Sequence, residues 1–207
     1  MKILIPSCKP NHETVALVET IAAVTPGAHF VLSSLPASAS VNRNSCLSHV
    51  HCDEIAIMLD DDIEGFYRGW VDDLVAPLAD PSVLMVSARL LNPDGSIGPT
   101  CSRCYDMTPD TIEIYSNGVA ILPTAAIAFR HLGICFDCAY VGSGFEDSDW
   151  CHQILREHPD GKFLQSNKCR LIHRNEMKNQ HGPNWKHNQM YFWNKWHGQR
   201  SPMRVTV

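Results

Sequence analysis

Three consecutive carboxylates, Asp60, Asp61 and Asp62, are the residues of this sequence best suited to bind a metal ion. They follow the mostly apolar run Glu54–Leu59, which has the composition of a buried strand. Because alternate residues of an extended segment point the same way, Asp60 and Asp62 can share one hard cation. Mg2+ or Mn2+ held in this way fills its other positions with water and substrate phosphates. The alternative is an acidic loop or helix start that Asp62 caps.

A second acidic group, Glu146-Asp147-Ser148-Asp149, opens a predicted helix. The helix dipole favours acids in a first turn, and this alone accounts for the pattern. The functional interpretation makes one of these acids a general base for an acceptor hydroxyl. His173, which ends an apolar segment, is either a structural residue or a third metal ligand beside the acidic triplet.

The nine cysteines and the lengths of the apolar runs indicate the compartment in which the protein is found. An odd number of cysteines fits a reducing compartment, where thiols stay free or bind metal. No apolar run reaches the roughly 18–20 residues of a membrane-spanning helix, and Met1–Pro6 is too short for a secretory signal. We therefore expect a cytoplasmic protein. Two Cys-x-x-Cys pairs could form a structural Zn2+ site, or could be free thiols: Cys101 with Cys104, and Cys135 with Cys138.

The charge is unevenly distributed along the chain. The net formal charge is −5, yet residues 162–207 carry nine lysines or arginines and one acid, Glu176. A basic end on an acidic body suggests an anionic ligand, although a solvated basic end is the simpler explanation. The segment Trp185–His197 also interleaves bases with aromatics. This mixture fits nucleic-acid bases, a sugar platform, a diphosphate contact, an interfacial patch, or a helix packed on the sheet.

The remaining patterns predict the elements that must position these groups. Apolar runs and helical periodicity alternate along the chain, which is typical of a mainly parallel α/β sheet. Such sheets bind ligands at the carboxyl ends of their strands, where Asp60 follows the third strand. A further apolar run, Val119–Phe129, contains Pro123, which favours an edge strand or a bulge. We expect strands at Lys2–Pro6, His29–Ser33, Glu54–Leu59, Val83–Ala88 and Lys168–His173, and helices at His12–Val24, Asn42–Val50, Trp70–Leu78, Asp147–Arg156 and Asn188–Trp196.

In this order, the motifs resemble glycosyltransferase family 2 and its GT-A relatives, particularly rhamnosyltransferase-like members. The resemblance spans nearly the whole chain. It implies a single GT-A (Rossmann-like) α/β domain over residues 1–174, with a nucleotide-sugar half (1–98), an acceptor half (99–174) and a basic aromatic tail (175–207). It rests on Arg43-Asn44, Met58–Asp62 as the DxD motif, the Pro-Asp-Gly turn of Leu90–Ile97, Gly133–Asp137 leading into Gly144–Asp149, His173, and Asn188–Trp196.

The resemblance also implies roles for individual residues. The metal, Mn2+ or Mg2+, would be bound by Asp60, Asp62 and His173. The catalytic base would be Asp147, with Glu146 beside it near the acceptor. The nucleotide-sugar donor would contact Ser7, Arg43, Asp60 and Asp61, with Arg174 and Lys178 neutralising the leaving diphosphate. Two departures stand out: Ser33–Ser38 lacks the family's nucleoside-binding acid, which leaves the nucleotide open, and Cys138 replaces an expected glutamate.

The activity implied is inverting transfer of a sugar from a nucleotide sugar to a hydroxyl of a glycan, a lipid-linked sugar or a small molecule. The basic, aromatic tail motivates one alternative, transfer to a hydroxymethylated base of viral DNA, although the overall acidity opposes a large DNA footprint. The other alternative is a non-catalytic nucleotide-binding module of the same fold.

Overall fold

A computed structural model describes residues 1–7, 11–98, 108–114, 124–174 and 184–198. They form one 8-stranded sheet in the order β2-β1-β3-β7-β5-β8-β4, with β6 paired to β8. The strands are β1 (Lys2–Pro6), β2 (His29–Ser33), β3 (Ile55–Leu59), β4 (Ile63–Glu64), β5 (Val83–Leu91), β6 (Thr111–Glu113), β7 (Ala126–Arg130) and β8 (Lys162–His173). The helices are α1 (Asn11–Val24), α2 (Ala39–Leu47), α3 (Trp70–Val75), α4 (Glu146–Glu157) and α5 (Trp185–His197).

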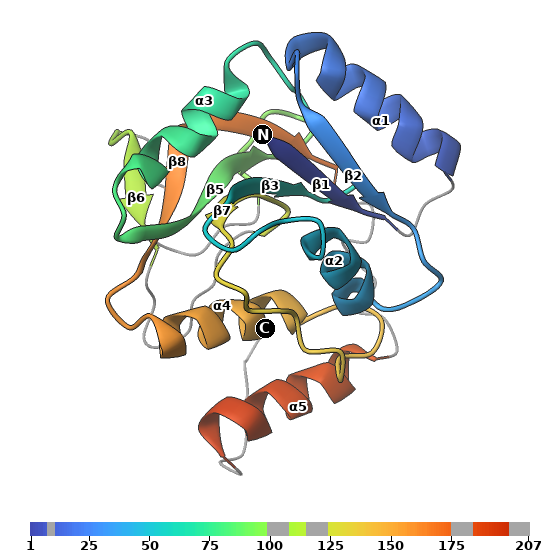
Figure 1. Cartoon of the computed structure of the whole chain (residues 1–207), viewed down its shortest axis with the longest axis vertical. Coiled ribbons are helices and arrows are strands. Elements are labelled where there is room, and N and C mark those ends of the chain that lie inside the picture. The colour runs from blue at the N-terminus through green and yellow to red at the C-terminus, as the bar shows by residue number, and fades with distance from the viewer. Residues whose placement is uncertain (8–10, 99–107, 115–123, 175–183, 199–207) are drawn as a thin grey trace.

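Helices cover both faces of the sheet (Figure 1). Helices α1 and α3 lie on one face, α2 and α4 lie on the other, and α5 lies beyond α4. The alternation of side chains along each strand explains the two apolar layers. In β1, Ile3 and Ile5 pack with α1 and α3, while Leu4 faces α2 and α4. The two-sided burial accounts for the continuous apolar runs in the sequence.

Strand direction brings the polar strand ends together. Strands β1, β2, β3, β5 and β8 run in one direction, and β4, β6 and β7 run in the other. The mixed α/β architecture with a mainly parallel sheet is therefore confirmed. Strands β1, β3 and β8 end at the same edge, so Ser7, Asp60 and His173 meet there. Strand β7 begins at this edge, which places Thr124 beside them.

Several predicted boundaries were wrong. Helix α2 begins at Ala39, not Asn42, because Ser38 caps it by accepting a hydrogen bond from the Val41 amide. Strand β8 is twice the predicted length. Helix α3 ends at Val75, and a 3-10 turn (Ala76–Ala79) containing Pro77 follows, since proline lacks the N–H of a helical bond.

For the run that ends at Phe129, the sequence left an edge strand or a bulge open, and the edge position was wrong. Strand β7 lies in the middle of the sheet, antiparallel to both β3 and β5. Pro123, on which that expectation rested, lies outside the described residues. The insertion of β7 between two strands of residues 1–98 also interleaves the two predicted halves in one sheet. Among the described residues, no helix combines the length and apolarity needed to cross a membrane.

Candidate functional site

Asp60, Asp62 and His173 come together at the carboxyl edge of the sheet. Their potential ligand atoms all lie within 4.8 Å of one another, and His173 Nε2 is 3.1 Å from Asp62 Oδ1. Local pairing sets this arrangement: Ile63 of β4 pairs with His173, and the Arg174 amide donates to the Asp62 carbonyl at 3.1 Å. Two carboxylates and one imidazole are suitable ligands for Mn2+ or Mg2+. The three predicted ligands thus lie close enough together to bind one divalent cation.

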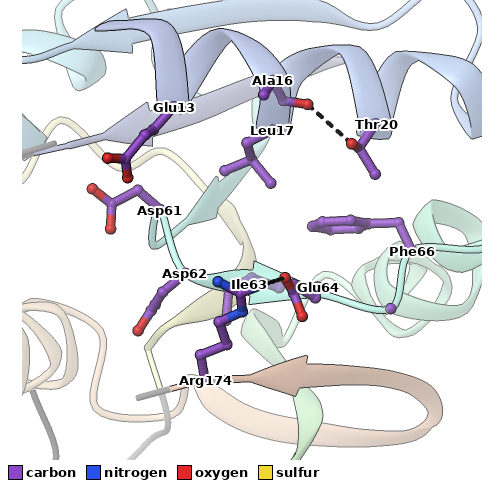
Figure 2. A pocket seen from close by; sticks show the side chains of 11 residues that line it. Glu13, Ala16, Leu17, Thr20, Asp61, Asp62, Ile63, Glu64, Phe66 and Arg174 are labelled. Carbon is purple, nitrogen blue, oxygen red and sulfur yellow. Dashed lines mark hydrogen bonds and ion pairs between the residues drawn. The ribbon is translucent and has the colours of Figure 1, made fainter. Parts of the chain in front are cut away.

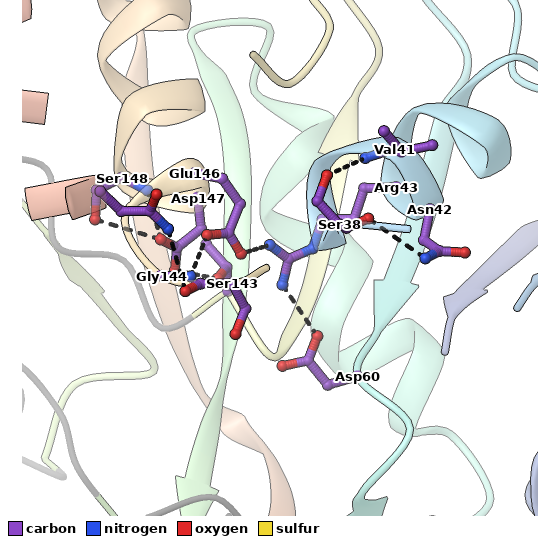
Figure 3. A network of polar contacts seen from close by, with 12 residues as sticks. Ser38, Val41, Asn42, Arg43, Asp60, Ser143, Gly144, Glu146, Asp147 and Ser148 are labelled. Atoms are coloured by element: carbon purple, nitrogen blue, oxygen red, sulfur yellow. Dashed lines mark hydrogen bonds and ion pairs between the residues drawn. The ribbon is translucent and has the colours of Figure 1, made fainter. Parts of the chain in front are cut away.

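A buried arginine links the metal-ligand cluster to helix α4 (Figure 3). The Arg43 guanidinium donates to Glu146 Oε1 at 2.6 Å and to Asp60 Oδ1 at 3.3 Å. Burial alone lowers the pKa of Arg43, but the charges of Glu146, Asp60 and Asp147 outweigh this effect and raise it. The arginine therefore stays charged, and it fixes the first turn of α4 relative to the end of β3.

The acids around Arg43 are held in a desolvated environment. Burial raises the pKa of Glu146; Arg43 opposes this shift and the charge of Asp147 adds to it. Burial likewise raises the pKa of Asp60, opposed by the charges of Arg43 and His173. The Glu146 carboxylate also accepts the Gly144 amide, so both of its oxygens have partners. Glu146 is thus placed in a buried ion pair, while its neighbour Asp147 is only half-buried.

Asp147 is positioned by a residue just before β7 and by its own helix. Thr124 Oγ1 donates to Asp147 Oδ2 at 2.8 Å, and the Ser148 amide donates to Oδ1 at 2.7 Å. These bonds orient the carboxylate at the N-terminal turn of α4. Asp149, the third acid of this turn, is fully buried and binds Trp196 and Lys195 of α5 instead. Of the three acids, Asp147 remains the accessible candidate for a base.

A cavity of about 400 Å3 opens beside the metal-ligand cluster. Asn42 shapes one of its walls: its side chain accepts from Ser33 Oγ and the Leu35 amide and donates to the Leu35 carbonyl. The volume lies within the range of small-ligand sites. The lining residues are Pro6, Ser7, Ala37, Ala39, Asn42, Arg43, Asp60, Asp61, Asp62, Gly142, Ser143 and His173.

A second cavity, of about 650 Å3, lies on the α1 side of the acidic triplet (Figure 2). Asp61 and Asp62 line both cavities. In Figure 2 the carboxylates of Glu13 and Asp61 point toward each other, and Arg174 pairs with Glu64 at 2.5 Å. Leu17 and Phe66 supply apolar surface. Four carboxylates and one arginine give this cavity a negative character.

Two solved structures are similar to this chain in fold. The chain superposes on GalNAc-T7, solved with UDP, GalNAc and Mn2+, with a TM-score of 0.58 and 16% identity, over 93% of this chain and 41% of that one. It superposes on a mycobacterial protein with a TM-score of 0.54 and 15% identity, over 84% of this chain and 67% of that one. The chain has the GT-A fold. No family model and no curated protein sequence matches it.

The comparisons and the geometry leave some sequence predictions without support. The chain spans less than half of the GalNAc-T7 chain, and identity this low establishes the fold alone. Lys178, Cys101 and Cys104 lie outside the described residues. Cys135 and Cys138 are exposed, free thiols. The four-cysteine zinc site therefore receives no support.

The structure also brings in residues that the sequence analysis did not select. Ser7, which was predicted to contact the donor, lines the cavity and donates to Asp61 Oδ2 at 2.5 Å. Thr124, Gly142 and Ser143, however, were not expected at this edge. A glycine followed by a serine in a loop is a weak signal, and only the antiparallel insertion of β7 brings Thr124 to Asp147.

Proposed function

We propose that this protein is a metal-dependent glycosyltransferase that transfers a sugar from a nucleotide-sugar donor to a hydroxyl acceptor. The observation that carries the proposal is the cluster of Asp60, Asp62 and His173 at the opening of a 400 Å3 cavity. The GT-A fold supports it, as does the similarity to a structure solved with UDP, GalNAc and Mn2+. The rhamnosyltransferase-like subgroup stays a hypothesis based on the Asn188–Trp196 segment.

The donor would occupy the 400 Å3 cavity. Asp60, Asp62 and His173 would hold Mn2+ or Mg2+, which when bound supplies positive charge to the donor diphosphate. Ser7 and Arg43 line the cavity and would orient the nucleotide. Asn42 holds the loop Ser34–Ser38, which carries no acid, so nucleoside contacts there would come from the backbone.

Asp147 would accept the proton of the acceptor hydroxyl. This oxygen would bond to the anomeric carbon as the bond from that carbon to the nucleoside diphosphate breaks, so that the configuration inverts. Thr124 and the Ser148 amide orient the carboxylate for this task. We assign Glu146 a positioning role, because its side chain is 4% exposed and bound to Arg43. Arg174, paired with Glu64, lines the α1-side cavity and not the donor cavity, so we place it away from the diphosphate.

The acceptor is proposed to be an uncharged hydroxyl compound such as a glycan. The supporting observation is the negative charge at this edge of the sheet, where Asp61 and Asp62 line both cavities. Carboxylates accept hydrogen bonds from hydroxyl groups, whereas they repel a polyphosphate backbone. The aromatics Trp185, Phe192 and Trp196 of α5 contact Phe145 and His152, so they pack within the protein. Both features disfavour DNA as the acceptor.

The test is the release of nucleoside diphosphate from a panel of nucleotide sugars, with Mn2+, with Mg2+ and with chelator, in the presence and absence of glycan acceptors. We expect metal-dependent release from one donor class. Metal-dependent donor binding without any release would favour the non-catalytic module. A protein that binds neither metal nor any nucleoside diphosphate would refute the proposed function.

A further inference from the structure

The C-terminal helix is tied directly to one wall of the donor cavity. This wall is the segment Val141–Phe145, from which Gly142 and Ser143 line the cavity. Asn188 of α5 is fully buried and accepts the Val141 amide at 3.1 Å. Its Nδ2 donates to the Val141 carbonyl at 2.9 Å and to the Ser143 carbonyl at 3.3 Å. One side-chain amide therefore binds three backbone groups on either side of Gly142.

The backbone of this wall needs such support. Gly142, Gly144 and Phe145 have φ angles of 67°, 107° and 70°. Phe145 is not a glycine, so its left-handed conformation is unfavourable and persists only where surrounding contacts determine it. Helix α5 provides those contacts, because the Phe145 ring packs against Trp185 and Phe192, with centroids 5.2 and 5.4 Å apart.

The two glycines allow α5 to approach the wall closely. A Cβ atom on Gly142 would lie 3.3 Å from Asn184 Nδ2, and one on Gly144 would lie 3.1 Å from Trp185 Cδ1. Both distances are tighter than ordinary van der Waals contact. The start of α5 thus fills the space behind the wall, and the wall cannot move away from the cavity without displacing α5.

The wall is also bonded directly to the start of helix α2. The Ala39 amide donates to the Gly142 carbonyl at 2.8 Å, and Ala39 begins the helix that carries Arg43. Phe145 precedes α4, which carries Glu146 and Asp147. The position of the wall therefore affects both the donor cavity and the first turn of α4.

We propose that α5 supports the donor site through Asn188. Asn188 is a positioning residue that holds Gly142 and Ser143 against the bound nucleoside diphosphate. This proposal rests on the proposed function, because it assigns the occupant of the cavity. Asn188 touches neither the metal ligands nor the acidic α1-side cavity. Its removal weakens diphosphate binding and leaves metal binding intact.

The anchoring of α5 makes this separation measurable. Lys195 binds Asp137 at 2.7 Å and Asp149 at 2.9 Å, and Trp196 Nε1 donates to Asp149 at 2.6 Å. These contacts hold the distal turns of the helix without Asn188. An Asn188→Ala variant therefore keeps α5 docked while it releases the wall.

The experiment compares Asn188→Ala with Met190→Ala, a matched change on the same helix at a side chain that is 62% exposed. Calorimetry measures the Kd of Mn2+ alone and of a nucleoside diphosphate with Mn2+. Hydrogen exchange follows the amides of residues 141–145. For Asn188→Ala we expect faster exchange and a diphosphate Kd raised about tenfold, the effect of about one net hydrogen bond, with the Mn2+ Kd unchanged. Met190→Ala should match the wild type.

The outcomes distinguish this proposal from the proposed function. Wild-type protein that binds no nucleoside diphosphate would refute the function and the donor-site role together. Normal wild-type binding with an unchanged diphosphate Kd in Asn188→Ala would refute the role of Asn188 alone, as would equal losses of Mn2+ and diphosphate affinity. If the alanine variant does not fold, Asn188→Asp keeps the acceptor for Val141 but cannot donate to the two carbonyls, and the same criteria apply.

Discussion

The buried pair of Arg43 and Glu146 gives the sharpest test of the site geometry, because it can be measured without substrate. Its side chains are 10% and 4% exposed, and they lie on elements 103 residues apart in the sequence. Arg43→Met keeps a long side chain and removes the charge. Glu146→Gln keeps the shape of the carboxylate and removes its charge. Together with the double variant, they form a complete thermodynamic cycle.

The expected magnitudes follow from what each change leaves behind. Arg43→Met leaves Glu146 buried and near Asp147, with the Gly144 amide as its remaining partner, so the cost is about 3 kcal/mol, at the low end for one half of a buried pair. Glu146→Gln leaves Arg43 with Asp60 at 3.3 Å, so the cost is about 2 kcal/mol. The double variant buries no unpaired charge and should cost about 2 kcal/mol less than the two single changes combined.

The assay is urea unfolding of the four proteins at pH 5 and pH 8. Without Arg43, the pKa of Glu146 in the folded state rises further above its ordinary value, since Arg43 is the group that opposes the effect of burial. The folded state then binds the proton more readily than the unfolded state, and stability falls as pH rises above about 4.3. The deficit of Arg43→Met should therefore be larger at pH 8 than at pH 5.

Two results would refute this reasoning. Additive single and double changes, within about 0.5 kcal/mol, would mean that Arg43 and Glu146 are not coupled in solution. A deficit for Arg43→Met that shrinks toward pH 8 would mean that Glu146 is not the buried carboxylate left unpaired. The double variant is the internal control, because it carries no carboxylate at position 146 and should lose this additional pH dependence.

Three further predictions address the metal, the base and the C-terminal helix. Asp62→Ala should weaken Mn2+ binding at least about tenfold in calorimetry, whereas Asp72→Ala, at an exposed acid of α3, should not; equal affinities would exclude Asp62 as a ligand. Asp147→Asn should bind nucleoside diphosphate normally and lose about 100-fold or more in turnover, and near-normal rates would reassign the base. Asp149→Asn should lower the free energy of unfolding by about 2–3 kcal/mol, because Lys195 loses a buried charged partner; a loss below about 0.5 kcal/mol in urea unfolding would contradict the anchoring of α5.

Much of the fold could be read from local patterns. The apolar runs of β1, β2 and β3 and the periodicity of α1 and α4 follow from side-chain alternation and helical spacing, which neighbouring residues encode. The order of β7 in the sheet could not be read in this way. A short apolar run does not state which strands it pairs with, and β7 pairs with β3 and β5, which precede it by tens of residues.

For the site, the residues suited to bind a divalent cation could be recognised in the sequence as an acidic triplet at a strand end and a histidine after the last strand, because residue type and strand direction are local properties. The partners of the individual acids became visible in the folded chain. The fold placed Glu146 against Arg43, left Asp147 beside Thr124, and seated Asn188 behind Gly142. These pairings join elements far apart in the chain, and they depend on how the helices pack on the finished sheet, which no local pattern of residues records.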